Sequence, residues 1–184
     1  IRERVLGPEH PDTLRSLNNL ASSLSSQGHY AEAEALDRKT LEIRERVLGP
    51  EHPDTLRSLN NLASSLKYQG RYAEAEALER KTLEISERVL GPEHPDTLRS
   101  LNNLASSLKY QGRYAEAEAL HRKALEARER ILGPEHPNTL TSLNNLARSL
   151  GNQGQYAEAE ALERKTLEIR ERVLGPEHPA TLYS

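Results

Sequence analysis

The stretch LNNLASSLSSQGHYAEAEAL, residues 17–36, contains the end of one predicted helix, a glycine turn and the start of a second helix. Before the turn, four apolar residues recur at the spacing of a single helix face, namely Leu17, Leu20, Ala21 and Leu24. Gly28 follows them, and glycine readily adopts the left-handed backbone conformation that ends a helix. The stretch therefore predicts two helices joined by a tight turn.

This helix pair is one unit of a repeat. The segment LGPEHP returns every 42 residues, beginning at Leu6, Leu48, Leu90, Leu132 and Leu174. Because the residue before a proline disfavours the helical conformation, these segments should separate the helix pairs. The predicted repeats are 1–42, 43–84, 85–126 and 127–168, with a partial repeat at 169–184, and the predicted pairs are 11–48, 53–90, 95–132 and 137–174.

In the first repeat we expect helices at about 11–27 and 30–48. Each pair has too little apolar surface to be stable alone, so stacking on its neighbours must bury the rest. No segment shows the alternating pattern of a half-buried strand. Residues 1–6 look like the end of an earlier second helix and 179–184 like the start of another first helix, so we expect a segment of a longer array. The near-identity of the repeats fits recent duplication or deliberate design.

The residues around the turn resemble the tetratricopeptide signature. In that signature a large residue, a leucine, a small residue, a large residue, a glycine, a tyrosine and an alanine follow one another at fixed spacing, and the matching residues here are Leu17, Leu20, Ala21, Leu24, Gly28, Tyr30 and Ala33. NNLA, YAEAEAL and LEIRERVLGPEHPDT closely resemble the 42-residue repeats of kinesin light chains and of repeat tails in many bacterial and fungal proteins. Leu17 departs from the usual tryptophan, and a position that is usually aromatic holds Asp37, Glu79, His121 and Glu163. The resemblance implies an all-α fold, a right-handed superhelical solenoid of stacked antiparallel helix pairs that forms one domain over residues 1–184.

Composition argues against several functional classes. The net charge of −3 and the absence of a basic stripe argue against nucleic-acid binding. No apolar run approaches the roughly 20 residues of a membrane helix. Without cysteine there can be no disulfide and no zinc–thiolate site. We expect no cofactor, no metal and a cytoplasmic location.

Two sets of titratable residues could suggest catalysis or metal binding. A histidine recurs in every LGPEHP segment, at His10, His52, His94, His136 and His178. Equivalent positions of stacked helix pairs lie on the order of 10 Å apart, so these rings cannot share one ion, and we assign them a structural role in the links. Neighbouring carboxylates, such as Glu32 with Glu34 and Glu74 with Glu76, are expected to be solvated. We also expect the i,i+4 ion pairs Glu34–Arg38 and Glu42–Arg46. No phosphate loop or metalloprotease motif is present, so we predict that the protein is not an enzyme.

The polar face of the first helices is the candidate binding site. In tetratricopeptide arrays these helices line a concave groove, so the resemblance implies that their polar residues face a ligand. The predicted peptide-binding residues are Arg15, Asn18, Ser22, Arg57, Asn60, Ser64, Tyr68, Arg99, Asn102, Ser106, Tyr110, Asn144 and Arg148. Asparagine can pair with a peptide amide and arginine with a carboxylate. A second interpretation is that the paired asparagines, which include Asn61, form a ladder that only fixes the packing of repeats.

Two functions are compatible with this sequence. The first is a protein–protein interaction module that binds an extended peptide or a partner helix in the groove. The second is a structural spacer, or a scaffold that stacks head to tail on further copies, because heterologous contacts need not close. Either could form part of the repeat tail of a larger signalling protein. The expected partner is a protein or peptide, or a second copy of the chain, and neither a nucleic acid nor a membrane.

Overall fold

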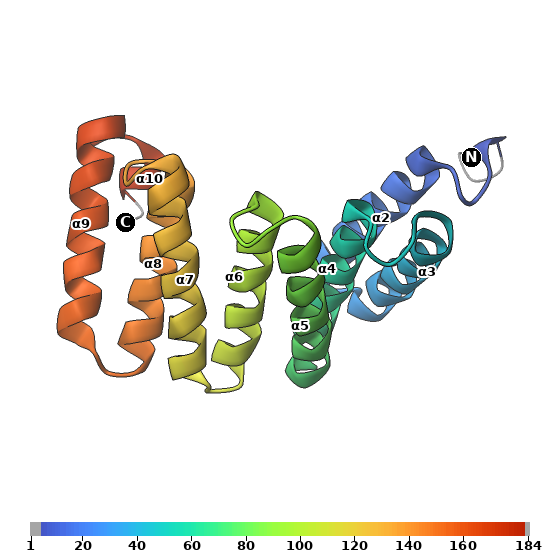
Figure 1. Cartoon of the computed structure of the whole chain (residues 1–184), viewed down its shortest axis with the longest axis horizontal. Helices are drawn as coiled ribbons and strands as arrows, with labels where there is room; N and C mark the ends of the chain where they lie inside the picture. Colours follow the sequence, from blue (N-terminus) through green and yellow to red (C-terminus); the bar gives the residue numbers. More distant parts are fainter. Residues whose placement is uncertain (1–4, 183–184) are drawn as a thin grey trace. The chain divides into compact units, whose positions relative to one another are not determined.

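The computed structural model describes residues 5–182, and the regular secondary structure within them is entirely α-helical (Figure 1). The first helices of the repeats are α2 (Pro11–Ser26), α4 (Pro53–Tyr68), α6 (Pro95–Tyr110) and α8 (Pro137–Asn152). The second helices are α3 (Tyr30–Leu48), α5 (Tyr72–Val89), α7 (Tyr114–Leu132) and α9 (Tyr156–Leu174), and α10 (Pro179–Leu182) begins one further repeat. The predicted all-α class is confirmed, and the predicted bounds of α2 and α3 differ from the observed ones by at most one residue.

The helices fall into two compact units, Ile1–Pro92 and Glu93–Ser184. In the first unit, α2 packs against α3, α3 against α4, and α4 against α5. In the second unit, α6, α7, α8 and α9 pack in the same consecutive order, and α10 rests on α9. Each unit is thus a stack of antiparallel helix pairs. That the units continue as one right-handed solenoid over residues 1–184 stays a prediction.

The histidines of the LGPEHP segments cap the first helices. The His10 Nδ1 atom accepts a hydrogen bond of 3.1 Å from the backbone N–H of Asp12, and the proline between them takes the first helical position. Equivalent bonds of 3.1–3.2 Å begin α4, α6 and α8. The side chain of a capping residue satisfies an N–H that the helix itself leaves unpaired. The structural role predicted for these histidines is therefore confirmed, and the cap explains why the ring is useful there.

Glycine ends the helices as expected. Gly28, between α2 and α3, has a φ angle of +84°, and Gly49, after α3, has +88°. Other residues reach this left-handed region only with strain, so the turn positions favour glycine. Gly151 is the exception, because it lies inside α8 and has no positive φ.

The predicted leucine stripe forms the hydrophobic core. In the first unit, α4 lies between α3 and α5 and buries Leu56, Leu59, Leu62, Ala63 and Leu66. In the second unit, α8 buries the matching residues Leu140, Leu143, Leu146, Ala147 and Leu150. One position behaves differently in α2, where Leu20 is 49% exposed although the equivalent Leu62 and Leu146 are each 2% exposed.

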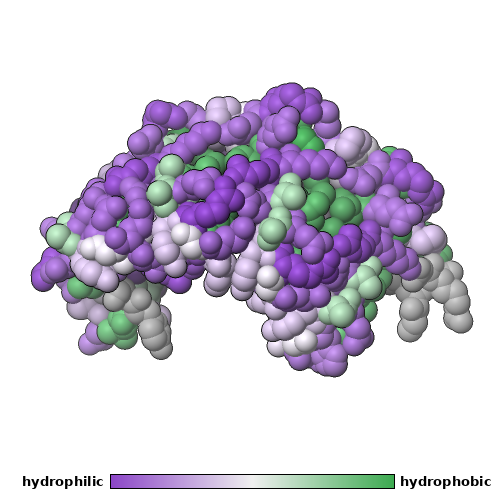
Figure 2. All heavy atoms as spheres, turned by 90° about the horizontal axis from the view of Figure 1, so that it is seen from below, coloured by the Kyte–Doolittle hydropathy of each residue, from purple (hydrophilic) through white to green (hydrophobic). Residues whose placement is uncertain are grey.

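The face of the molecule drawn in Figure 2 is mainly polar. Figure 2 shows a largely hydrophilic face on which apolar residues form separate small patches. Scattered apolar residues of this kind are normal on soluble proteins and carry no functional signal by themselves. Among the described helices, none has a stretch long and apolar enough to cross a bilayer.

Candidate functional site

The polar side chains of α2 and α4 enclose a groove in the first unit. Two pockets, of about 390 and 720 Å³, lie along these helices and share the lining residues Asn18, Ser22 and Asn61. Their walls also include side chains from α3. Because the pockets share residues, we treat them as one continuous surface, the first-helix groove.

Most of the predicted binding residues of the first unit line this groove. The structure brings together Arg15, Asn18, Ser22, Arg57, Ser64 and Tyr68 around the two pockets. Asn60 is the exception, because it is only 9% exposed and lines neither pocket. Its neighbour Asn61 lines both. The two members of the asparagine pair therefore have different surroundings, and the ligand-binding role of either remains a prediction.

Arg44 forms a buried part of the groove wall that sequence reasoning missed. This α3 side chain donates hydrogen bonds to the backbone oxygen of Asp54 at 3.1 Å and to Ser58 Oγ at 2.8 Å. With its amide oxygen turned toward α3, Asn18 accepts two further bonds from Arg44 at 3.0 and 3.3 Å. Burial lowers the pKa of the Arg44 guanidinium, and the charge of Asp54 opposes that effect. Arg44 thus ties α3 to α4 and places Asn18 in the groove.

Two tyrosines close one end of the groove. The rings of Tyr30 and Tyr68 are stacked, with centroids 5.3 Å apart and planes inclined by 8°. Tyr68 is nevertheless 60% exposed, so most of its surface stays available to a ligand. Exposed aromatic rings held by a neighbour are well suited to anchor a partner, because little side-chain freedom is lost on binding.

In the second unit a different pocket contains two of the predicted binding residues. Tyr110 and Arg148 line a space of about 680 Å³ together with Tyr114, Tyr156 and Lys109. The other predicted residues of this unit lie on α6 and α8 outside that pocket, namely Arg99, Asn102, Ser106 and Asn144. Arg99 pairs with Asp96 at 3.0 Å.

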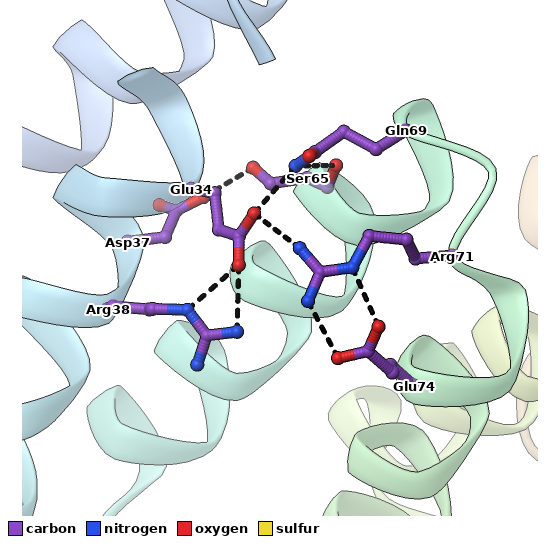
Figure 3. A network of polar contacts seen from close by, with 7 residues as sticks. All are labelled: Glu34, Asp37, Arg38, Ser65, Gln69, Arg71 and Glu74. Carbon is purple, nitrogen blue, oxygen red and sulfur yellow. Dashed lines mark hydrogen bonds and ion pairs between the residues drawn. The ribbon is translucent and has the colours of Figure 1, made fainter. Parts of the chain in front are cut away.

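Glu34 belongs to a polar network that joins consecutive repeats (Figure 3). Its carboxylate accepts hydrogen bonds from Arg38, from Gln69 Nε2 at 2.8 Å and from Arg71 Nη1 at 2.7 Å. Burial raises the pKa of Glu34, but the three donors lower it by more, so the net shift is downward. Nearby, Ser65 donates a 2.6 Å bond to the buried carboxylate of Asp37. These contacts fix α3 against α4 and the turn that follows it.

Two charge predictions require correction. Glu34 and Glu76 were expected to be solvated, but each of these side chains is only 12% exposed. The turn after α4 supplies two of the donors to Glu34, from Gln69 and Arg71. The predicted pair of Glu42 and Arg46 is wrong, because Arg46 reaches instead to Glu9 in the preceding link at 2.8 Å. The predicted Glu34–Arg38 pair is confirmed at 2.7 Å.

The described residues contain no group of three or more histidine, aspartate or glutamate side chains placed to hold a metal. The groove offers hydrogen bonding from amides, hydroxyls and guanidinium groups, an apolar wall that includes the exposed Val47 and Leu48, and aromatic contact at its end. Such a surface can hold the backbone and side chains of a bound chain.

Comparisons with known proteins agree with this architecture. Sequence models of the tetratricopeptide repeat match residues 13–54, 55–96 and 96–172. A crystal structure of a putative kinesin light chain from Podosopora anserina, with nearly identical TPR-like repeats, is 31% identical with a TM-score of 0.81, covering 94% of this chain and 82% of that one. A second crystal structure under the same description is also 31% identical, with a TM-score of 0.77 and coverages of 93% and 81%.

A more distant structure shares the fold alone. BtubC from P. vanneervenii is 22% identical, with a TM-score of 0.78 over 92% of this chain and 68% of that one. No curated protein sequence shows significant similarity to the chain.

Proposed function

The chain belongs to the tetratricopeptide repeat family, and on that premise we propose that it is a non-enzymatic interaction module that binds an extended peptide or partner helix in the first-helix groove. The tetratricopeptide fold generally serves as a scaffold for protein–protein interactions, and its members are typically not enzymes. The observation that carries the proposal is the pair of connected pockets lined by Asn18, Ser22 and Asn61.

The chemistry of the groove supports a peptide ligand. The side-chain amide of Asn61 lies where both pockets meet, and an amide can donate to and accept from a peptide backbone. Arg57 adds an exposed guanidinium, held by Asp54 at 3.0 Å. Contacts to a peptide backbone do not depend on the partner's side chains. We therefore expect the chain to bind peptides of many different sequences, with Tyr68 and Arg57 as the positions that discriminate among them.

The test is binding of the purified chain to a peptide array, compared with the double variant Arg57→Ala/Asn61→Ala. We expect peptides that bind the parent chain to bind the variant at least tenfold more weakly, about 1.4 kcal/mol, because two groove donors are lost. The control is Glu42→Ala, an exposed α3 residue outside both pockets, which should bind as the parent does. If circular dichroism shows intact folding and the double variant binds normally, the groove is not the site.

One observation favours a second candidate, head-to-tail self-association. The face of α2 that carries Leu20 is exposed, whereas the same face of α4 is covered and buries Leu62. A second copy that packed on α2 would bury Leu20 in the same way. We then expect the mass measured by sedimentation to rise with concentration and Leu20→Lys to abolish the rise. A constant monomer mass would exclude this function.

A further inference from the structure

The first unit contains an internal ion pair that the second unit lacks. In the first unit, Lys67 Nζ on α4 lies 2.9 Å from Glu79 Oε1 on α5. The equivalent residues 42 positions later are Lys109 on α6 and His121 on α7. The repeat therefore keeps the cation but replaces its carboxylate with an imidazole.

His121 cannot act as the missing anion. It is buried, and its Nδ1 atom lies 2.8 Å from Ser149 Oγ. Burial, and then the charges of Lys109, Arg148 and Arg128, lower the pKa of His121 to about 4, so the ring is neutral at pH 7. Residue 121 therefore supplies no negative charge to balance the charge of Lys109.

Arg148 adds a second cation near Lys109. Arg148 occupies the position that is serine in the two preceding repeats, at Ser64 and Ser106. Neither Lys109 nor Arg148 forms an ion pair within the part of the chain that the structure describes. Lys109 Nζ instead lies over the ring of Tyr110, 4.7 Å from its centroid. Burial and the neighbouring Arg148 lower the pKa of Lys109, as expected for a cation without a counter-ion.

Both cations line the pocket of about 680 Å³, which we call the Lys109 pocket. Its other walls include Gly151, which leaves room because it has no side chain, and the rings of Tyr114 and Tyr156. Two carboxylates also contribute to the lining. Glu160 is paired with Arg164 at 2.7 Å, and Glu163 is the second acidic side chain of the lining.

We propose that the Lys109 pocket binds an acidic side chain of a partner peptide, whose carboxylate pairs with Lys109 and Arg148 as Glu79 pairs with Lys67 in the first unit. This inference rests on the proposed function, because it adds a specific anchor to a peptide-binding module. The Lys109 pocket selects for charge, whereas the first-helix groove offers both hydrogen bonds and apolar contact.

The decisive comparison uses two substitutions of His121 that differ in charge alone. The probe is a fluorescein-labelled octapeptide of alternating glutamate and serine, and the reference is the same peptide with glutamine in place of glutamate. We expect the parent chain to prefer the glutamate peptide at 0.1 M salt. His121→Glu supplies an internal carboxylate for Lys109 and should weaken that binding at least tenfold, whereas the neutral His121→Gln should retain it.

Two further variants sharpen the test. Glu163→Gln removes one of the two carboxylates of the pocket and should strengthen binding of the glutamate peptide severalfold. Lys109→Ala should abolish the preference of the chain for the glutamate peptide over the glutamine peptide. Equal affinity of His121→Glu and His121→Gln, or equal binding of both peptides to the parent, would overturn the inference. Displacement of the peptide by millimolar inorganic phosphate would also overturn it, because the pocket would then be a general anion site.

Failure of the inference can be distinguished from failure of the proposed function. In one outcome the two His121 variants bind the glutamate peptide equally, while Arg57→Ala/Asn61→Ala no longer binds the array peptides that the parent chain binds. In that case the first-helix groove binds peptides and the Lys109 pocket does not. If the parent chain binds neither labelled peptide and no peptide on the array, both proposals fall together.

Discussion

Replacement of Leu62 by alanine should lower the free energy of unfolding by about 2–5 kcal/mol. Leu62 is 2% exposed and belongs to the cluster that α4 forms with residues of α3 and α5. The change removes three buried carbon atoms and leaves a cavity between helices that cannot close without moving. Urea unfolding followed by circular dichroism measures the loss.

The repeat provides a matched control for this substitution. Leu20 occupies the same position in α2 and is 49% exposed, so Leu20→Ala should cost less than about 1 kcal/mol. The two substitutions have identical chemistry, and their difference isolates burial. Equal costs for both would mean that Leu62 does not lie in the core as described.

Acidification should destabilise the second unit through His121. The pKa of this ring is lowered to about 4 in the folded chain, against 6.5 for an unperturbed histidine. Between these values the unfolded chain takes up a proton that the folded chain excludes. The contribution of His121 is therefore fully present above pH 6.5 and is lost as the pH falls toward 4. The loss is roughly 3 kcal/mol at about 1.4 kcal/mol per pKa unit.

The variant His121→Gln isolates this effect, because glutamine does not titrate while the other groups of the chain are unchanged. The free energies of unfolding of parent and variant are compared at pH 7 and pH 4 by urea titration. We expect the parent to lose about 3 kcal/mol more than the variant over this range. Parallel pH profiles would show that His121 is protonated equally in the folded and unfolded chains.

The sequence predicted the helices well because their signals are local and are repeated. The proline of each link, the glycine of each turn and the leucines between them specify the bounds of α2 and α3 within one residue. The contribution of the histidine cap was harder to foresee. Serine, threonine, asparagine and aspartate are the usual capping residues, so the ring nitrogen of His10 did not stand out as an acceptor.

The candidate site was predicted only in part. The polar face of the first helices does line a groove, but helix periodicity could not separate Asn60, which is buried, from Asn61, which lines both pockets. Arg44 escaped notice because it lies on a second helix and reaches α4 across the interhelical contact. The sequence did contain a signal for this role, because arginine recurs at the position of Arg44 in three of four repeats, the residues being Arg44, Ser86, Arg128 and Arg170. A charged side chain at a mostly apolar helix contact needs a polar partner.

The network around Glu34 has a consequence for how such genes can change. Glu34 meets Gln69 and Arg71, and Glu118 meets Gln153 across the same separation of 35 residues as Glu34 and Gln69. Unequal crossing-over between near-identical repeats adds or removes whole 42-residue segments. Each such event keeps these separations, so the new neighbours meet with complementary side chains already in place. A change in the number of repeats can therefore preserve this glutamate–glutamine contact between neighbouring repeats.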